Sequence, residues 1–253
     1  MKKIITTIII TIICITLNAN DLASVKSPTA AVLSRGEARV YQKIYRDNGI
    51  KFGFDVGLFD NFQAGFSYGA DDFFGSNDIE WHSKPDFQVR LRLIDEEKTF
   101  PAVAIGVDTH GHGTYSKAYD RYDIKSKGLY AVASKNYQFL GLLGFDFGMN
   151  YSFETKDEDK DIDFFVAAYK TIGQQITVFA EFTAGFNDYD SETKKEDPKY
   201  YIMGRGRGYL STAVLWRLNN NISLKFQMFD MLENRHDTNF GDRALMLDYR
   251  WFF

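Results

Sequence analysis

The chain contains little cysteine, histidine or proline, and the shortage of cysteine excludes a class of site. Its single cysteine, Cys14, lies in an apolar segment near the start, so the remainder has no disulfide and no thiol chemistry. Only four histidines and four prolines occur among 253 residues. Beyond that first segment, no apolar run is long enough for a membrane-spanning helix. The formal net charge of −4 argues against a nucleic-acid partner.

The first residues have the pattern of an export signal. Lys2 and Lys3 precede an apolar run at positions 4–17, which is about 14 residues long and too short to span a bilayer as a helix. Ala19 suits the small residue that precedes a cleavage site. We therefore predict a signal peptide at residues 1–19, with an uncleaved amino-terminal anchor as the alternative.

Aromatic residues are abundant, at 16% of the chain with 23 Phe and 15 Tyr, yet the mean hydropathy is only −0.30. A membrane β-barrel combines these two properties. Its lipid-facing and lumen-facing residues alternate along every strand, so the average conceals the apolar face.

Apolar and polar residues alternate with a period of two along many segments. Phe145, Phe147 and Met149, for example, alternate with Asp146 and Asn150. The pattern predicts an all-β protein, a transmembrane antiparallel up-and-down β-barrel of about twelve strands. We expect the strands at 37–46, 50–58, 61–69, 86–94, 101–109, 127–136, 142–153, 162–170, 175–186, 207–217, 221–230 and 243–253.

The connections support the barrel over a soluble β-sandwich or lectin-like domain, which would also alternate. Asn48-Gly49 is a tight hairpin signal, and later connections alternate between long and short. Outer-membrane barrels have short periplasmic turns and longer outside loops. With twelve strands both termini are periplasmic, so we predict a periplasmic segment at 20–36 and an integral outer-membrane barrel at 37–253.

Charges of both signs fall on the predicted lumen face. Such side chains can pair in a structural ion network that closes the lumen, or line a narrow passage. Arg90 and Arg92 share one face, so we expect acidic partners, with Asp55 and Asp108 on adjacent strands the nearest candidates. The predicted lumen network comprises Asp55, Arg90, Arg92, Asp108, Asp146, Glu181, Arg217 and Lys225, with Lys51, Asn150, Asp248 and Arg250 on the same face.

The last strand ends on an aromatic residue. Tyr249, Trp251 and Phe253 fall on one face. We interpret these three as a signal that the outer-membrane assembly machinery recognises, and we expect Phe253 to face lipid at the periplasmic rim.

Motifs for metals, cofactors or catalysis are weak, and we predict no catalytic residue, cofactor or metal. His110-Gly-His112 has no apparent third ligand for zinc. The acidic stretches 157–161 and 188–192 lack the glycine and closing glutamate of a calcium loop, which favours outside loops. No Gly-x-Ser-x-Gly elbow accompanies the histidines. We interpret the glycine-arginine stretch at 204–208 as the flexible base of a loop. The alternative is that its two arginines contact lipopolysaccharide phosphates.

Several blocks resemble the YjbH-like outer-membrane barrel family over about residues 27–253. The resemblance implies a link to exopolysaccharide production or export, and it carries over no catalytic residues. The blocks are Ser27-Pro28-Thr29-Ala30, Gly57-Leu58-Phe59-Asp60, Ser67-Tyr68-Gly69, Glu80-Trp81, Arg92-Leu93-Ile94-Asp95-Glu96, Phe100-Pro101-Ala102-Val103-Ala104-Ile105-Gly106 and, the most specific, Ser126-Lys127-Gly128-Leu129-Tyr130-Ala131-Val132-Ala133-Ser134-Lys135-Asn136-Tyr137.

The sequence thus predicts an integral outer-membrane barrel with a non-enzymatic envelope role in exopolysaccharide production or secretion. The alternatives are a diffusion channel for small solutes and, third, a lipid-modifying enzyme. The expected partners are outer-membrane lipids and lipopolysaccharide, the assembly machinery and a polysaccharide.

Overall fold

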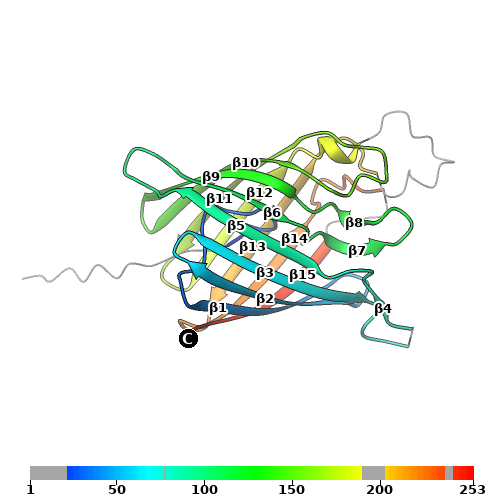
Figure 1. Ribbon diagram of the computed structural model, residues 1–253, viewed down its shortest axis with the longest axis horizontal. Coiled ribbons are helices and arrows are strands. Elements are labelled where there is room, and N and C mark those ends of the chain that lie inside the picture. Colours follow the sequence, from blue (N-terminus) through cyan, green and yellow to red (C-terminus); the bar gives the residue numbers. More distant parts are fainter. Residues whose placement is uncertain (1–21, 77, 190–202, 237–241) are drawn as a thin grey trace, which may run out of the picture.

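The chain forms a closed antiparallel barrel of twelve strands (Figure 1). The computed structural model describes residues 22–76, 78–189, 203–236 and 242–253, so the predicted signal peptide, 1–19, lies outside the described residues. The barrel strands are β1 (Glu37–Tyr45), β2 (Gly49–Phe59), β3 (Phe62–Asp71), β5 (Asp86–Ile94), β6 (Ala102–Asp108), β9 (Gly128–Gln138), β10 (Leu142–Tyr151), β11 (Asp163–Ile172), β12 (Ile176–Thr183), β13 (Tyr209–Arg217), β14 (Ile222–Phe229) and β15 (Asp242–Phe252). The predicted barrel and its strand count are confirmed.

The first and last strands close the ring. β1 pairs with β15 from Glu37↔Phe252 to Tyr45↔Ala244, and every other barrel strand pairs with its neighbours in the chain. Closure matters because an open sheet would leave a row of unpaired amide and carbonyl groups at each edge. A barrel satisfies them internally, as a bilayer requires.

The connections divide by length between the two ends of the barrel. Where β1 begins and β15 stops, the turns are short, and we call this the short-turn end; these turns are 60–61, 95–101, 139–141, 173–175 and 218–221. The opposite end, the long-loop end, carries the connections 46–48, 72–85, 109–127, 152–162, 184–208 and 230–241. The alternation predicted from the sequence is therefore present, with the Asn48-Gly49 hairpin as the one short connection at the long-loop end.

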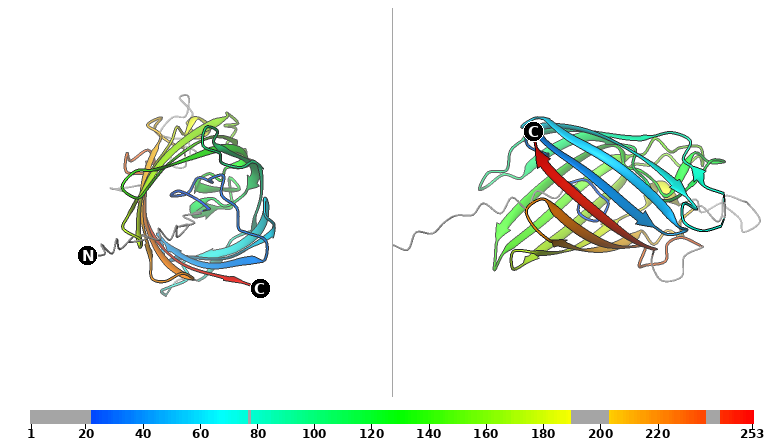
Figure 2. Two further views of the ribbon diagram at one scale, coloured as in Figure 1. Left: turned by 90° about the vertical axis from the view of Figure 1, so that its left-hand side faces the viewer. Right: turned by 90° about the horizontal axis from the view of Figure 1, so that it is seen from below.

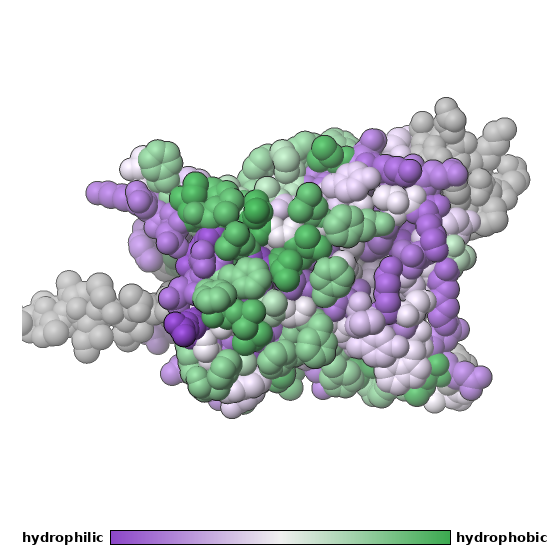
Figure 3. Space-filling view, in the orientation of Figure 1, coloured by the Kyte–Doolittle hydropathy of each residue, from purple (hydrophilic) through white to green (hydrophobic). Residues whose placement is uncertain are grey.

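The two faces of the barrel wall have opposite chemistry. On β10, Phe145, Phe147 and Met149 are exposed outside, whereas Asp146 and Asn150 are buried inside. Apolar side chains cover the outer surface over the strands, and hydrophilic residues gather over the loops (Figure 3). Exposing so much apolar surface to water would be costly, and a lipid environment removes that cost.

The predicted assembly signal lies on this outer surface. Tyr249 and Phe253 are exposed, and the ring of Trp251 stacks on Tyr249 with centroids 5.5 Å apart. The amide of Phe253 donates to the carbonyl of Gly36, which ties the end of the chain to the start of β1. Recognition by the assembly machinery stays a prediction.

Short elements decorate the long-loop end. β4 (Glu80–Trp81) extends the sheet beside β3, and η1 (Phe186–Asp188) is a single 3-10 turn. β7 (His112–Ser116) and β8 (Arg121–Ile124) form a separate two-stranded hairpin within the connection from β6 to β9. Within the described ranges, no helix has the length and apolarity to cross a membrane.

Candidate functional site

Residues 22–36 lie inside the barrel, and we call them the plug segment. Figure 2 shows this stretch within the ring of strands when the barrel is viewed along its length. Leu22, Val25 and Leu33 are buried there. The sequence predicts a periplasmic segment at 20–36, and the structure places residues 22–36 within the ring of strands. The strand pattern begins at residue 37, so it carries no information about where the preceding segment lies.

A single carboxylate on the wall, Glu181 of β12, holds the first turn of the plug segment. It accepts hydrogen bonds from the hydroxyls of Ser24 (2.8 Å) and Ser27 (2.9 Å). It also accepts from the backbone amides of Val25, Lys26 and Ser27, each at 2.9 Å. An irregular segment removed from water needs partners for its amides, and Glu181 supplies several at once.

Cationic side chains of the wall satisfy the carbonyls of the same segment. Arg90 of β5 donates from Nη1 to the carbonyls of Leu22 (2.8 Å) and Ala31 (2.6 Å). Lys225 of β14 donates to the carbonyl of Ala23 (2.9 Å). Acidic and basic residues on different strands of the wall therefore bind the plug segment.

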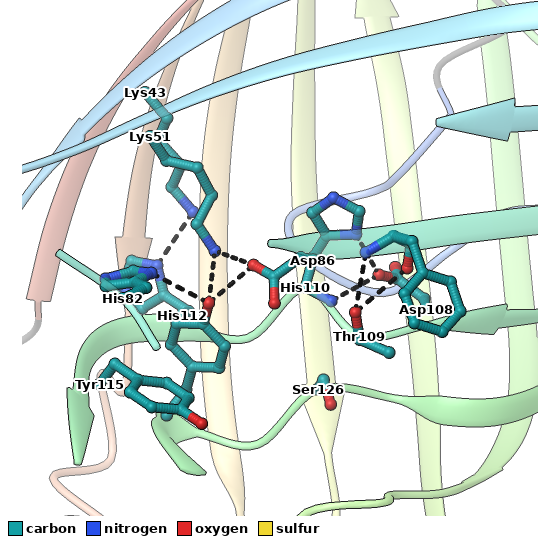
Figure 4. A network of polar contacts seen from close by, with 12 residues as sticks. Lys43, Lys51, His82, Asp86, Asp108, Thr109, His110, His112, Tyr115 and Ser126 are labelled. Atoms are coloured by element: carbon teal, nitrogen blue, oxygen red, sulfur yellow. Dashed lines mark hydrogen bonds and ion pairs between the residues drawn. The ribbon is translucent and has the colours of Figure 1, made fainter. Parts of the chain in front are cut away.

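The β7–β8 hairpin closes the lumen from the long-loop end. The hydroxyl of Tyr122 donates to Asp86 at 2.7 Å and lies 3.1 Å from Nδ1 of His82. Lys51 pairs with the same Asp86 oxygen at 2.7 Å (Figure 4). Burial and the neighbouring Asp86 raise the pKa of Tyr122 well above its usual range, which keeps the hydroxyl protonated as a donor.

The other strand of the hairpin reaches the opposite wall. Nδ1 of His112 accepts from Lys43 of β1 at 2.9 Å, and Nε2 lies 3.1 Å from a carboxylate oxygen of Asp242. The imidazole also stacks on Phe229, with centroids 3.6 Å apart. Burial, together with Lys43, lowers the pKa of His112 to about 3, so the ring is neutral. The hairpin thus spans the mouth from β6 and β9 to β1, β14 and β15.

A buried ion cluster anchors the base of the hairpin. Nη1 of Arg121 lies 2.6 Å from Asp157 and 2.8 Å from Asp188. Lys125 also pairs with Asp157, at 2.7 Å. The plug and the hairpin meet where Nζ of Lys26 donates to the carbonyl of Ile124 at 3.2 Å.

Parts of the predicted lumen network form ion pairs inside the barrel. Asp55 pairs with Arg39 of β1 at 3.1 Å, and Arg39 also contacts Asp248. Arg250 reaches the second oxygen of Asp248 at 3.1 Å. The sequence analysis did not include Arg39 and Lys43. Their neighbours Val40 and Ile44 face the outside of the barrel, and because side chains alternate along a strand, Arg39 and Lys43 must face the lumen.

The predicted pairing of Arg90 and Arg92 with Asp55 and Asp108 is wrong. Arg90 contacts carbonyls of the plug segment and, within the described part of the chain, has no carboxylate within 4 Å. Arg92 lies near the short-turn end and pairs with Asp95 at 2.7 Å. The plug segment, which the strand pattern does not reveal, supplies the acceptors for Arg90.

The remaining predicted lumen residues contact an imidazole and two hydroxyl groups. Asp108 lies 2.6 Å from Nδ1 of His110. Asp146 accepts from Ser134 at 2.5 Å, and Arg217 donates to the hydroxyl of a threonine, Thr177, at 2.8 Å. Glu181, Arg90 and Lys225 likewise bind backbone groups of the plug segment. Many contacts in the lumen are therefore hydrogen bonds of charged side chains to backbone or hydroxyl groups.

The histidine pair and the glycine-arginine stretch are also engaged within the fold. His110 and His112 have different partners, and in the described residues no three His, Cys, Asp or Glu side chains cluster as metal ligands. Arg205 and Arg207 donate to the carbonyls of His236 (3.4 Å) and Leu232 (3.2 Å). Of the acidic stretches, 190–192 lies outside the described residues.

A cavity of about 120 Å³ remains between the plug segment, the barrel wall and the residues His110 and Gly111 that precede β7. Its lining includes two carboxylates, Asp108 and Asp248, together with His110 and Gln227. Cationic side chains are more numerous in the lining: Lys26, Arg39, Lys43, Lys51, Arg90, Lys225 and Arg250. The cavity therefore offers room for a small solute beside several charged side chains.

Comparison with known proteins supports the fold. No protein-family model and no curated protein matches the chain. Among solved structures, the chain is similar to a KdgM porin in complex with disordered oligogalacturonate, with a TM-score of 0.50, 8% identity, and coverage of 86% of this chain and 99% of that one. It is also similar to Omp33 of Acinetobacter baumannii, with a TM-score of 0.42, 8% identity, and coverage of 86% and 97%. The chain therefore has the fold of outer-membrane β-barrel porins.

Proposed function

We propose that this protein is an integral outer-membrane barrel that provides a narrow passage for small solutes. The apolar outer surface fits a bilayer, and the ring of strands encloses polar groups throughout its length. The fold shared with the KdgM porin supports the same assignment. Its expected partners are outer-membrane lipids, lipopolysaccharide and the assembly machinery.

One observation carries this proposal: the lumen is filled by polar, non-covalent contacts and contains a cavity lined by polar and charged side chains. The plug segment is held by hydrogen bonds from wall residues such as Glu181 and Arg90. Water can replace each of these bonds when the segment shifts, so opening the lumen breaks no covalent bond. Passage then requires movement of the plug, the hairpin or both.

Single-channel recording in planar bilayers tests the proposal. We expect small, infrequent conductance steps from the full-length protein, and larger or more frequent steps from Glu181→Ala, which releases the first turn of the plug. Lys98→Gln, at an exposed lysine of the short-turn end, is the control and leaves the steps unchanged. Silence from both the full-length protein and Glu181→Ala, with both folded, would refute the passage.

The exopolysaccharide role implied by the family resemblance stays a prediction. A deletion strain that exports normal amounts of surface polysaccharide would argue against it. The absence of enzymatic activity also stays a prediction, and turnover of labelled phospholipid or lipid A by the purified barrel would contradict it.

A further inference from the structure

The cavity in the lumen contains more positive than negative charge once the visible ion pairs are subtracted. Arg39 and Arg250 share Asp248, and Lys51 pairs with Asp86. These pairs account for part of the cationic lining.

Three of the basic side chains in the lining have uncharged partners. Lys43 donates to the neutral ring of His112, and Lys26 donates to backbone carbonyls such as that of Ile124. Arg90 donates to two carbonyls and to the hydroxyl of Tyr130 at 2.8 Å. Within the described residues, no carboxylate lies within 4 Å of the charged nitrogens of these three side chains.

Arg90 makes the charge excess firm, because a guanidinium does not lose its proton in a protein. Arg90 is only 2% exposed, so bulk water screens its charge poorly. Enclosed charges of one sign are costly unless an opposite charge joins them. An anion in the cavity would supply that charge.

Two further groups of the lining lack partners and indicate what else the ligand carries. Nε2 of His110 and Oε1 of Gln227 are buried with no hydrogen-bond partner in the described residues. The amide nitrogen of Gln227 already donates to the carbonyl of Val25 at 2.6 Å, which leaves its oxygen as an acceptor. A hydroxyl group on the ligand would satisfy that acceptor.

The volume sets the size of the ligand. Since one water needs roughly 10–15 Å³ of such space, the cavity of about 120 Å³ corresponds to about ten water-sized positions. That is enough for an organic molecule of about ten non-hydrogen atoms and too little for a sugar polymer.

From these observations we propose that the lumen cavity is a binding site for a small hydroxylated organic dianion, held by Arg90, Lys43 and Lys26. The inference rests on the proposed passage and names the class of solute that it accepts. Cations converge on the cavity from β1, β5 and the plug segment, so two acidic groups of one molecule can be bound from different sides.

Titration calorimetry on the full-length barrel in detergent at low salt tests the site, with tartrate, succinate, inorganic phosphate and glucose as separate titrants. We expect binding of both dicarboxylates, tighter for tartrate because of its hydroxyls, and none of glucose. Loss of one charged contact in Arg90→Gln or Lys43→Gln should weaken tartrate binding by about tenfold or more. Lys98→Gln is the control and should bind like the unaltered protein.

Because Arg90 also holds the plug, heat-modifiable mobility on gels must show that Arg90→Gln is folded, and Lys43→Gln provides the independent variant. No binding of tartrate or succinate, binding of glucose equal to theirs, or unchanged affinity in a folded Lys43→Gln would overturn the site. Phosphate binding as tight as tartrate would overturn the organic class. Conductance without dianion binding would contradict the binding site and support the passage. Binding without conductance would support the binding site and contradict the passage.

Discussion

At the scale of single residues, the lumen depends on a few charged side chains that bind backbone groups. Glu181 accepts hydrogen bonds from amides and hydroxyls of the plug segment, and Arg90 donates to its carbonyls. Charge-assisted hydrogen bonds of this kind are roughly twice as strong as neutral ones. Each of these two wall residues therefore stabilises the bound plug segment more than a neutral side chain of the same size would.

We predict that Glu181→Ala exposes the plug segment. In a Ser24→Cys variant, the new thiol would be the only one in the mature protein if the signal is cleaved as predicted, and Ser24 is fully buried. A soluble maleimide should label it at least about tenfold faster in the Glu181→Ala background, since several hydrogen bonds of about 1 kcal/mol or more each are lost. Equal labelling rates in the two backgrounds would contradict the role of Glu181.

A second prediction concerns pH and His112. Its pKa in the folded chain is lowered from 6.5 to about 3, by burial and then by Lys43, so the unfolded state binds the proton first as the pH falls. The stability contributed by the neutral ring is present above about pH 6.5 and is lost as the pH falls toward 3, by at most about 1.4 kcal/mol per pH unit.

Limited proteolysis of the hairpin between pH 7 and 4 measures this effect. Cleavage near the hairpin should increase at acid pH in the unaltered protein and change less in His112→Gln. The same pH dependence in both proteins would show that another group is responsible.

At the scale of elements, the hairpin is a cap fixed by buried charges. Arg121 contacts two carboxylates, Asp157 and Asp188, that come from different connections of the long-loop end. All three side chains are almost fully buried. The ion cluster thereby ties the hairpin to loops that the strand pattern alone leaves unrelated.

We predict that Arg121→Ala destabilises the cap by about 3–5 kcal/mol, because it leaves two buried carboxylates without their shared cation. Opening of the loops, measured by hydrogen exchange of the 112–124 amides, should accelerate while the barrel strands stay protected. Lys117→Ala, at an exposed pair with Glu80, is the control and should have little effect. Unchanged exchange in Arg121→Ala would mean that the cluster does not hold the hairpin.

At the scale of the whole molecule, the barrel is closed by its own chain from both ends. The plug enters from the short-turn end, and the hairpin folds in from the long-loop end. Their meeting at Lys26 and Ile124 leaves the small cavity as the remaining space. In the proposed passage, opening and selectivity would therefore depend on the segments inside the ring, and the ring of strands would serve as their frame.

The orientation of this frame in the membrane yields a further prediction. Asp159 lies in a long-loop connection, whereas Gly173 and Asn220 lie in turns at the short-turn end. Cysteines placed at Asp159 should be labelled on intact cells, and those at Gly173 or Asn220 only after the outer membrane is opened. The reverse pattern would show that the barrel is inserted the other way. Asp190, a second candidate position for the label, lies outside the described residues.

The sequence by itself determined the strands. Alternation such as that of Phe145, Asp146 and Phe147 depends only on the period of an extended chain, and it placed all twelve strands and the alternation of long and short connections. An even number of strands then brings the start of β1 and the end of β15 to one end. These are local properties, since each follows from residues close together in the chain.

Only the tertiary structure decided what fills the lumen. Residues 22–36 have no strand periodicity, and their partners Glu181, Arg90 and Lys225 are remote in sequence. The sequence showed that these charges face inward, and it led to the wrong pairing of Arg90 because the plug's carbonyls were not foreseeable as acceptors. A backbone carbonyl is present at every residue, so its use in a distant contact leaves no mark on composition or spacing.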